Sequence, residues 1–119
     1  MKLNLKLFMS KRTPKLLVED IIESCNKILD YTKDLQFEEF LKDNKTVDAV
    51  IRNFEIIGEA ANRLPEDFKD QFDSIDWYRI RGFRNRIVHD YAGIDYSIVW
   101  EIKNNYLPKL LSSLKSLTL

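Results

Sequence analysis

Apolar side chains recur every three or four residues along most of this chain, and this period constrains the fold more than any other feature of the sequence. The spacing places apolar residues on one face of an α-helix, whereas a half-buried β-strand would alternate apolar and polar residues. Only three glycines and three prolines interrupt the 119 residues. The pattern therefore predicts an all-α fold, an up-and-down four-helix bundle with short additional helices and no strand.

Capping and turn residues divide the first half of the chain into helices. Thr13 followed by Pro14 is typical of a helix start, because proline is tolerated at the first helical position. The first long helix is expected to continue to about residue 32, and a short helix is expected over residues 37–42. Thr46 is then expected to cap a second long helix, which ends near Leu64.

The second half of the chain is divided in the same way. A short helix is expected over residues 65–72, and a longer helix is expected to begin around Asp76 and to end just after Tyr91. Asp95 is expected to cap the last helix. Pro108 should kink that helix or split it in two, because proline cannot donate the backbone hydrogen bond of a helix interior.

Two small residues on these helices have packing consequences. Gly58 lowers helix propensity by about 1 kcal/mol relative to alanine, and the small residues around it suggest close approach of another helix, either within the chain or across a dimer. Cys25 is the only cysteine, so no internal disulfide can form. It shares a helical face with apolar residues and is interpreted as part of the core in a reducing cytoplasm.

The chain is expected to hold one domain over residues 13–119, preceded by an arm or extension over residues 1–12. That first stretch is too short, and too interrupted by lysine and asparagine, for a signal peptide or a membrane span. We therefore expect a cytoplasmic protein without membrane association.

Charge is concentrated in the stretch RIRGFRNRIVHDY, from Arg79 to Tyr91. It contains the only histidine, His89, and four of the seven arginines, while the whole chain has a formal net charge of zero. A local positive field of this kind attracts phosphates. The four arginines of the stretch are Arg79, Arg81, Arg84 and Arg86. We interpret Arg79, Arg81 and Arg86 either as RNA-binding residues or as part of an ordinary solvated face.

Arg84 falls within the apolar arc when this stretch is drawn as a regular helix. A charged group there is costly unless it is paired or holds a phosphate. Two interpretations stay open: a structural ion pair with Glu55 or Glu59 of the second long helix, or a functional guanidinium.

His89 lies on a different arc, four residues after Asn85, which could hydrogen-bond its imidazole. Arg84 and His89 are separated by about 140° on an ideal helix. A single regular helix would therefore not direct both at one substrate, so either the helix ends near His89 or two chains complete the site. A solvated or capping histidine is the simpler alternative.

The residue types limit the chemistry. One histidine and one cysteine do not make a metal-ligand cluster, and no glycine-rich phosphate loop or cofactor motif is present. Acid and base chemistry without a metal or cofactor remains. An imidazole can move protons near neutral pH, and a guanidinium can hold a phosphate and stabilise charge on it, a combination that suits RNA cleavage.

These residues also carry a resemblance to a known family. Arg84, His89 and Tyr91, in the spacing RxxxxHxY, are the signature of the HEPN superfamily in the form found in HepT-like ribonuclease toxins. Three longer stretches look like the same family: TVDAVIRNFEIIGEAANRL, DWYRIRGFRNRIVHDYAGID and VWEIKNNYLPKL. The resemblance covers the chain from about Lys15 to its end.

The resemblance implies a metal-independent endoribonuclease in which Arg84 and His89 are the catalytic pair and Asn85 supports them. RNA would be cleaved by attack of a ribose 2′-hydroxyl, and a homodimer would bring two motifs into one cleft. It further implies a type VII-like toxin–antitoxin pair. There, a cognate MntA-like nucleotidyltransferase antitoxin would adenylylate Tyr91 and silence the toxin. Core packing is the other interpretation of Tyr91, and the two are compatible.

Two other functions compete with this one. A non-catalytic HEPN bundle could dock on a nucleotidyltransferase and help to bind its substrate, or a dimeric bundle could have a purely structural role. The combination of Arg84, Asn85, His89 and Tyr91 favours the nuclease, because a binding domain would not require an imidazole at this position.

Overall fold

The computed structural model describes residues 12–89 and 93–119, most of which are helical. The elements in chain order are α2 (Pro14–Thr32), α3 (Phe37–Lys42), α4 (Asn44–Arg63), α5 (Glu66–Gln71), α6 (Trp77–Arg81), α7 (Phe83–Ile87), β1 (Val88–His89), β2 (Gly93–Ile94), α8 (Tyr96–Asn105) and α9 (Leu107–Lys115). The predicted all-α class is confirmed, with one short pair of strands that the sequence did not lead us to expect. The expected arm over residues 1–12 lies outside the described residues, except for Arg12.

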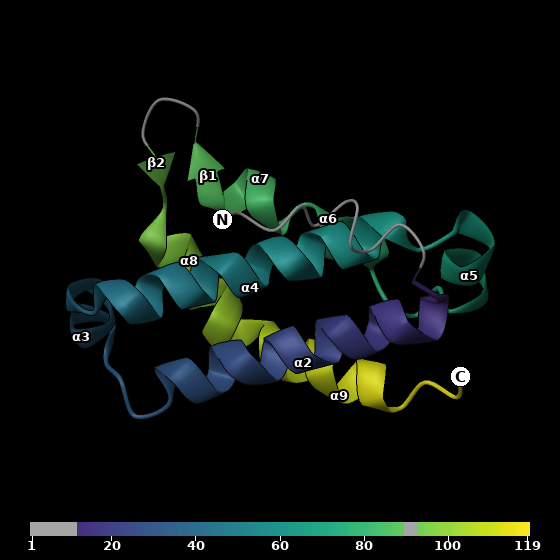
Figure 1. Ribbon diagram of the computed structural model, residues 1–119, viewed down its shortest axis with the longest axis horizontal. Helices are drawn as coiled ribbons and strands as arrows, with labels where there is room; N and C mark the ends of the chain where they lie inside the picture. Colours follow the sequence, from purple (N-terminus) through teal and green to yellow (C-terminus); the bar gives the residue numbers. More distant parts are fainter. Residues whose placement is uncertain (1–11, 90–92) are drawn as a thin grey trace.

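The helices form four rods that alternate in direction: α2, α4, α6 followed by α7, and α8 followed by α9. α2 and α4 pack along each other, α6 and α7 lie against α4, and α8 and α9 close the bundle against α7 and α2. Figure 1 shows the chain reversing between α2 and α4, again between α4 and α6, and again between α7 and α8. The up-and-down bundle with short additional helices, here α3 and α5, is therefore confirmed.

Apolar side chains from all four rods meet in one core. The Phe83 ring of α7 stands edge-on to Phe54 of α4 and to Tyr106, with centroid distances of 5.8 and 5.6 Å. Edge-to-face pairs of this kind contribute about 1 kcal/mol beyond the burial of their area. Cys25 is fully buried, and burial raises the pKa of its thiol to about 12, which confirms its interpretation as a core residue.

Helix starts mostly agree with the capping residues of the sequence. Thr13 caps α2 and Asp95 caps α8, as predicted. The expected cap at Thr46 is wrong: α4 begins earlier, and its N-cap is Asp43, whose Oδ1 accepts the Thr46 N–H at 3.1 Å. Pro108 lies in the first turn of α9, where its missing N–H costs no helical hydrogen bond, so the predicted split of the last helix is confirmed.

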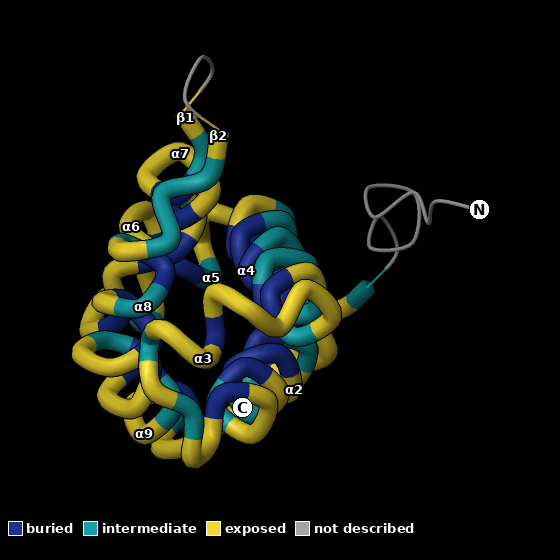
Figure 2. Tube along the Cα trace, turned by 90° about the vertical axis from the view of Figure 1, so that its left-hand side faces the viewer, coloured by how far each residue is buried: buried dark blue, intermediate teal, exposed yellow. Residues whose placement is uncertain are grey.

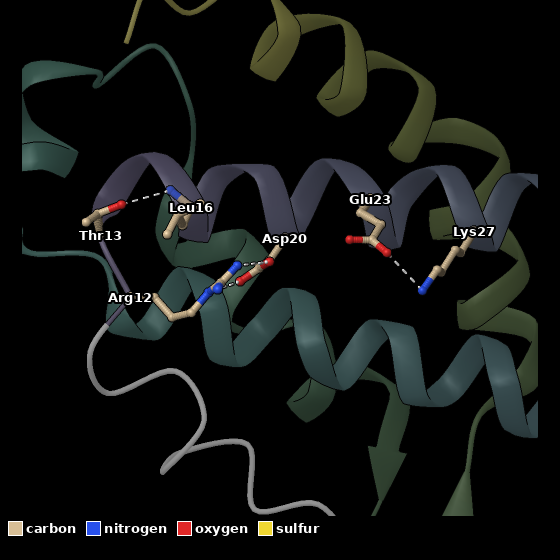
Figure 3. Close-up of polar contacts among 6 residues, drawn as sticks. All are labelled: Arg12, Thr13, Leu16, Asp20, Glu23 and Lys27. Atoms are coloured by element: carbon tan, nitrogen blue, oxygen red, sulfur yellow. Dashed lines mark hydrogen bonds and ion pairs between the residues drawn. The ribbon is translucent and has the colours of Figure 1, made fainter.

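The start of α2 is held by two further contacts. Arg12 pairs with Asp20 in two parallel bonds, Nη2 to Oδ1 at 2.7 Å and Nε to Oδ2 at 3.0 Å, and Thr13 Oγ1 accepts the Leu16 N–H at 3.3 Å (Figure 3). Two-pronged pairing of a guanidinium with a carboxylate fixes its orientation as well as its distance. The chain is therefore tied to the bundle from Arg12 onward.

The helix predicted over residues 76–91 is wrong in its second half. It breaks at Gly82 and ends at Ile87, and the chain then forms an antiparallel hairpin in which Val88 pairs with Ile94. Two causes act together. The carbonyl of Ile87 accepts the Asp95 N–H at 2.7 Å, which pins the base of the hairpin. Val88 and Ile94 are both half-buried against the core, which favours pairing of these β-branched residues.

Gly58 meets another helix within the chain. A Cβ atom on Gly58 would lie 3.5 Å from the carbonyl oxygen of Arg81 in α6. Of the two alternatives for its close packing, the internal one is therefore observed.

Among the described residues, no helix is long and apolar enough to cross a membrane.

Substitution of Gly58 and of Gly93 by alanine should have opposite effects on the free energy of unfolding. Gly58→Ala would make only ordinary van der Waals contact, so the free energy of unfolding should stay unchanged or rise by up to about 1 kcal/mol from helix propensity. Gly93 has φ +77°, a conformation that alanine adopts only with strain, so Gly93→Ala should lower the free energy of unfolding by about 1–2 kcal/mol. Urea denaturation of both variants measures the difference. A clear loss of stability for Gly58→Ala would mean that α4 and α6 lie closer than described.

Candidate functional site

α6 and α7 present a buried apolar face and an exposed basic one. Trp77, Ile80, Phe83 and Ile87 are buried, whereas all four arginines of the stretch and Asn85 are exposed. The expected place of Arg84 in the apolar arc is wrong. The helix is interrupted at Gly82, so a count of 100° per residue does not carry across the junction. The chain thereby avoids burying an unpaired charge, which is strongly unfavourable.

Arg84 does not form the structural ion pair considered from the sequence. Glu55 lies 3.5 Å from Arg52, and Glu59 lies 2.8 Å from Arg63, so both carboxylates are paired within α4. In residues 12–89 and 93–119, no side-chain hydrogen bond or ion pair involves the Arg84 guanidinium. Its five N–H donors face solvent and are available to an external anion.

The other arginines are exposed in different settings. The Arg79 guanidinium carbon lies 4.0 Å from the centroid of the Tyr106 ring, and that of Arg81 lies 5.2 Å from the centroid of Tyr78. Both distances are within the range of a cation–π contact. These contacts orient the two guanidiniums without neutralising their charge. Arg86 is exposed on α7.

His89 lies on β1, outside the helix, and its side chain is 49% exposed. Its Nε2 is 3.6 Å from Oδ2 of Asp95. This separation is longer than a hydrogen bond, so the contact is electrostatic and becomes an ion pair when the imidazole is protonated. Of the two explanations for the angle between Arg84 and His89, the end of the helix before His89 is observed.

Asp95 is held in place by three interactions. Its backbone N–H donates to Ile87 at 2.7 Å, its Oδ1 accepts the Ile98 N–H at 3.2 Å, and its Oδ2 faces His89. The sequence predicted the cap on α8 but not the contact with His89. The β-branched Val88 and Ile94, with Gly93 between them in the sequence, were the signal for a strand pair that would have placed Asp95 beside the imidazole.

The hydrogen bond expected between Asn85 and His89 is not formed. It required a continuous helix through both residues, and α7 ends at Ile87. Asn85 is exposed on α7, and the described polar contact of the imidazole is with Asp95. Tyr91, the predicted modification site, lies outside the described residues.

The site lies at one edge of the bundle. Figure 1 shows α7 leading into β1 at the end of the third rod, and Figure 2 shows exposed as well as half-buried residues in β1 and β2. Across residues 12–89 and 93–119, no group of three or more His, Cys, Asp or Glu side chains gathers in a way that could hold a metal ion. The arrangement offers an exposed imidazole, a carboxylate beside it and several exposed guanidiniums.

Comparisons with known proteins point to one family. A family model described as "Ribonuclease HepT-like" matches residues 21–117. A protein of Methanocaldococcus jannaschii named "Putative RNase" is 39% identical over 109 residues, which cover 92% of this chain and 90% of that protein. A protein of Thermococcus cleftensis named "Probable ribonuclease HepT" is 38% identical over 107 residues, which cover 90% and 97%. No solved structure gives a significant match.

Substitution of Asp95 should separate its cap from its charge. Asp95→Ala removes the acceptor of the Ile98 N–H and should lower the free energy of unfolding by about 1 kcal/mol. Asp95→Asn keeps a good capping group and should lower the free energy of unfolding by only about 0.3 kcal/mol. Urea denaturation measures both. The same pair of substitutions at Asp43, the N-cap of α4, is the matched control. Equal losses for Asp95→Ala and Asp95→Asn would show that the carboxylate stabilises the fold by its charge.

Proposed function

Because this chain belongs to the ribonuclease HepT-like family of the HEPN superfamily, we propose that it is an endoribonuclease that cleaves RNA without a metal ion. The observation that carries the proposal is the exposed pair of Arg84 and His89 at the end of α7, with Asp95 facing the imidazole. The Arg84 guanidinium is exposed and has no side-chain partner in the part of the chain that the structure describes, which suits a phosphate ligand, and an exposed imidazole suits proton transfer.

His89 and Arg84 divide the reaction between them. The imidazole of His89 takes the proton from a ribose 2′-hydroxyl, whose oxygen attacks the adjacent phosphorus and forms a new P–O bond. The bond from phosphorus to the 5′-oxygen breaks, and that oxygen takes a proton from an imidazolium or from water as it leaves. Arg84 holds the non-bridging oxygens and stabilises the charge that builds on them. The products are a 2′,3′-cyclic phosphate and a free 5′-hydroxyl.

Asp95 is a positioning residue in this proposal. Its carboxylate is fixed by the cap on α8 and by the base of the hairpin, so it orients the imidazole from one side. It also stabilises the imidazolium that forms when His89 has taken the proton. Asn85 is exposed on the last turn of α7 and has a supporting role as a polar contact to the substrate.

The remaining arginines bind the RNA strand. Arg79, Arg81 and Arg86 are exposed on the same two short helices as Arg84. Contacts of this type bind the phosphate backbone irrespective of sequence and weaken as salt rises. RNA is therefore drawn to one edge of a molecule whose net charge is zero.

A homodimer completes the site in this proposal. α7 and the hairpin lie at an uncovered edge of the bundle (Figure 2), where a second copy could place its own α7 opposite the first. A two-fold axis at this edge would bring two Arg84 and two His89 side chains into one cleft. Each scissile phosphate would then be held by Arg84 of one protomer while His89 of the other moves the proton.

The activity is that of a toxin in a type VII-like toxin–antitoxin pair, acting on RNA in the cytoplasm. A cognate MntA-like nucleotidyltransferase is the antitoxin, and it transfers AMP to Tyr91. The tyrosine oxygen attacks the α-phosphate of ATP and pyrophosphate leaves. The added phosphate carries negative charge two residues from His89, where it repels the RNA backbone and occupies the cleft.

Cleavage by variants tests the nuclease. In excess chelator the wild-type protein should cleave RNA, whereas His89→Ala should lower kcat by about 10²–10⁴-fold and Arg84→Ala by about 10²–10³-fold. Product analysis by gel and mass spectrometry should show 2′,3′-cyclic phosphate ends. Arg52→Ala, which removes an arginine from α4, is the matched control and should retain activity.

An equimolar mixture of His89→Ala and Arg84→Ala subunits, refolded together, adds the test of a shared site. Each mixed dimer would contain one site with both residues intact, so activity should return to about a quarter of the wild-type level. A mixture as inactive as its components would place each site within one protomer. A wild-type protein without cleavage activity would favour the non-catalytic HEPN bundle that docks on a nucleotidyltransferase.

Adenylylation is tested at Tyr91. Incubation with ATP and an MntA-like nucleotidyltransferase from the same genome should add one AMP to the protein and abolish RNA cleavage, as intact-mass spectrometry and a cleavage assay measure. Tyr91→Phe lacks the accepting hydroxyl and should stay unmodified and active. A Tyr91→Phe protein that still gains AMP would reject this site, and Tyr96→Phe, five residues later on α8, controls for modification of another tyrosine.

A further inference from the structure

Tyr78 on α6 is an aromatic ring held in an exposed position. It is 55% exposed, more than any other large apolar side chain among the described residues. Its hydroxyl donates a hydrogen bond of 2.7 Å to Oε2 of Glu66 on α5. This bond lowers the pKa of the Glu66 carboxyl and raises that of the Tyr78 hydroxyl, so both groups stay in the states that form it near neutral pH. The ring is therefore presented to solvent in a fixed orientation.

Two cations surround the ring. The Arg81 guanidinium carbon is 5.2 Å from the ring centroid, and Nζ of Lys69 is 5.4 Å from it. Lys69 is buried and also pairs with Glu66 at 3.5 Å, whereas Arg81 is exposed. The exposed Tyr78 thus lies beside an exposed guanidinium that can bind an external phosphate. An aromatic face beside a basic side chain is the arrangement with which proteins bind single-stranded nucleic acid.

Tyr78 lies on α6, the helix that leads through Gly82 into α7 and the proposed cleavage site. Backbone hydrogen bonds continue across Gly82. Its N–H donates to the backbone carbonyl of Tyr78 at 3.0 Å, and its carbonyl accepts the Arg86 N–H at 3.2 Å. Tyr78 and Arg81, three residues apart, share one side of α6, and the exposed Asn85 follows on α7. The nine residue steps from Tyr78 to Ile87, with Gly82 in a helical backbone conformation, rise about 14 Å along α6 and α7.

We propose that Tyr78 is a stacking site for a base of the RNA strand, separate from the site at which the strand is cut. Arg81 holds a phosphate next to that base. The distance of about 14 Å corresponds to roughly four stacked nucleotides at about 3.4 Å each. The stacking site therefore contacts a nucleotide several positions from the scissile phosphate at His89. This proposal rests on the proposed RNA cleavage, and it adds a contact that only longer substrates can make.

A purely structural role is the competing explanation. Tyr78 joins α6 to α5 through Glu66 and lies beside the buried Lys69, so its ring could serve only to cover that lysine. The two roles depend on different atoms. The bond to Glu66 needs the hydroxyl, whereas stacking needs the ring and a free face. Tyr78→Phe removes the first and keeps the second, and Tyr78→Ala removes both.

Binding to RNA of two lengths tests the proposal. The dissociation constants of a single-stranded octanucleotide and a trinucleotide are measured by fluorescence anisotropy with His89→Ala protein, so that binding is observed without cleavage. Adding Tyr78→Ala should raise the octanucleotide constant about tenfold, the loss expected for one stacked base, and leave the trinucleotide constant unchanged. Adding Tyr78→Phe should leave the dissociation constant for the octanucleotide within about twofold of that of the His89→Ala protein. Tyr31→Ala, which removes an exposed tyrosine from α2, is the matched control.

The outcomes separate this proposal from the nuclease itself. Equal octanucleotide affinity with and without the Tyr78 ring overturns the stacking site, even where the wild-type protein cleaves RNA. An equal loss for Tyr78→Phe and Tyr78→Ala also overturns it, because the tie to Glu66 would then be responsible. Octanucleotide binding that depends on the ring, in a protein whose wild-type form does not cleave, supports the stacking site and rejects the nuclease.

Discussion

The geometry of the site depends on one residue, Asp95, which takes part in three different interactions. Its backbone N–H donates to the carbonyl of Ile87 at 2.7 Å, which ties the start of α8 to the end of α7. One carboxylate oxygen begins α8 and the other faces the imidazole of His89. Because a helix end, a helix start and a functional side chain meet at one residue, the position of His89 is fixed by the fold of the bundle and not by the hairpin alone.

The sequence predicted those parts of the structure that local chemistry decides. Thr13, Asp95 and Pro108 act where their capping and backbone properties place them, and the three- and four-residue period correctly placed Cys25 in the core. The start of α4 was missed because Asp43 and Thr46 are both capping residues, and only the folded chain selects between them.

The prediction failed where contacts distant in sequence decide the structure. The stretch after Phe83 has a good helical pattern, but pairing of Val88 with Ile94 and their packing on the core outweigh it. The error carried over to the site. An unbroken helix placed Arg84 in the core and Asn85 beside His89, and the break at Gly82 and the end at Ile87 changed both. The assignment of Arg84 and His89 as a catalytic pair came from the resemblance to HepT-like ribonucleases, and it therefore did not change with the helix geometry.

The exposed basic face has a cost that a purely structural bundle would not need to bear. Four like charges within eight residues repel one another, and an i,i+4 pairing with acidic residues, as in Arg63 with Glu59, would relieve that repulsion. On α6 and α7 the exposed positions instead hold Arg79, Arg81, Arg84 and Arg86, and two of these guanidiniums contact aromatic rings. Aromatic contacts orient a cation and leave its charge intact, whereas a carboxylate would neutralise it. Four exposed guanidiniums on α6 and α7 therefore remain accessible to an anionic substrate, and Asp95 is the carboxylate beside the imidazole.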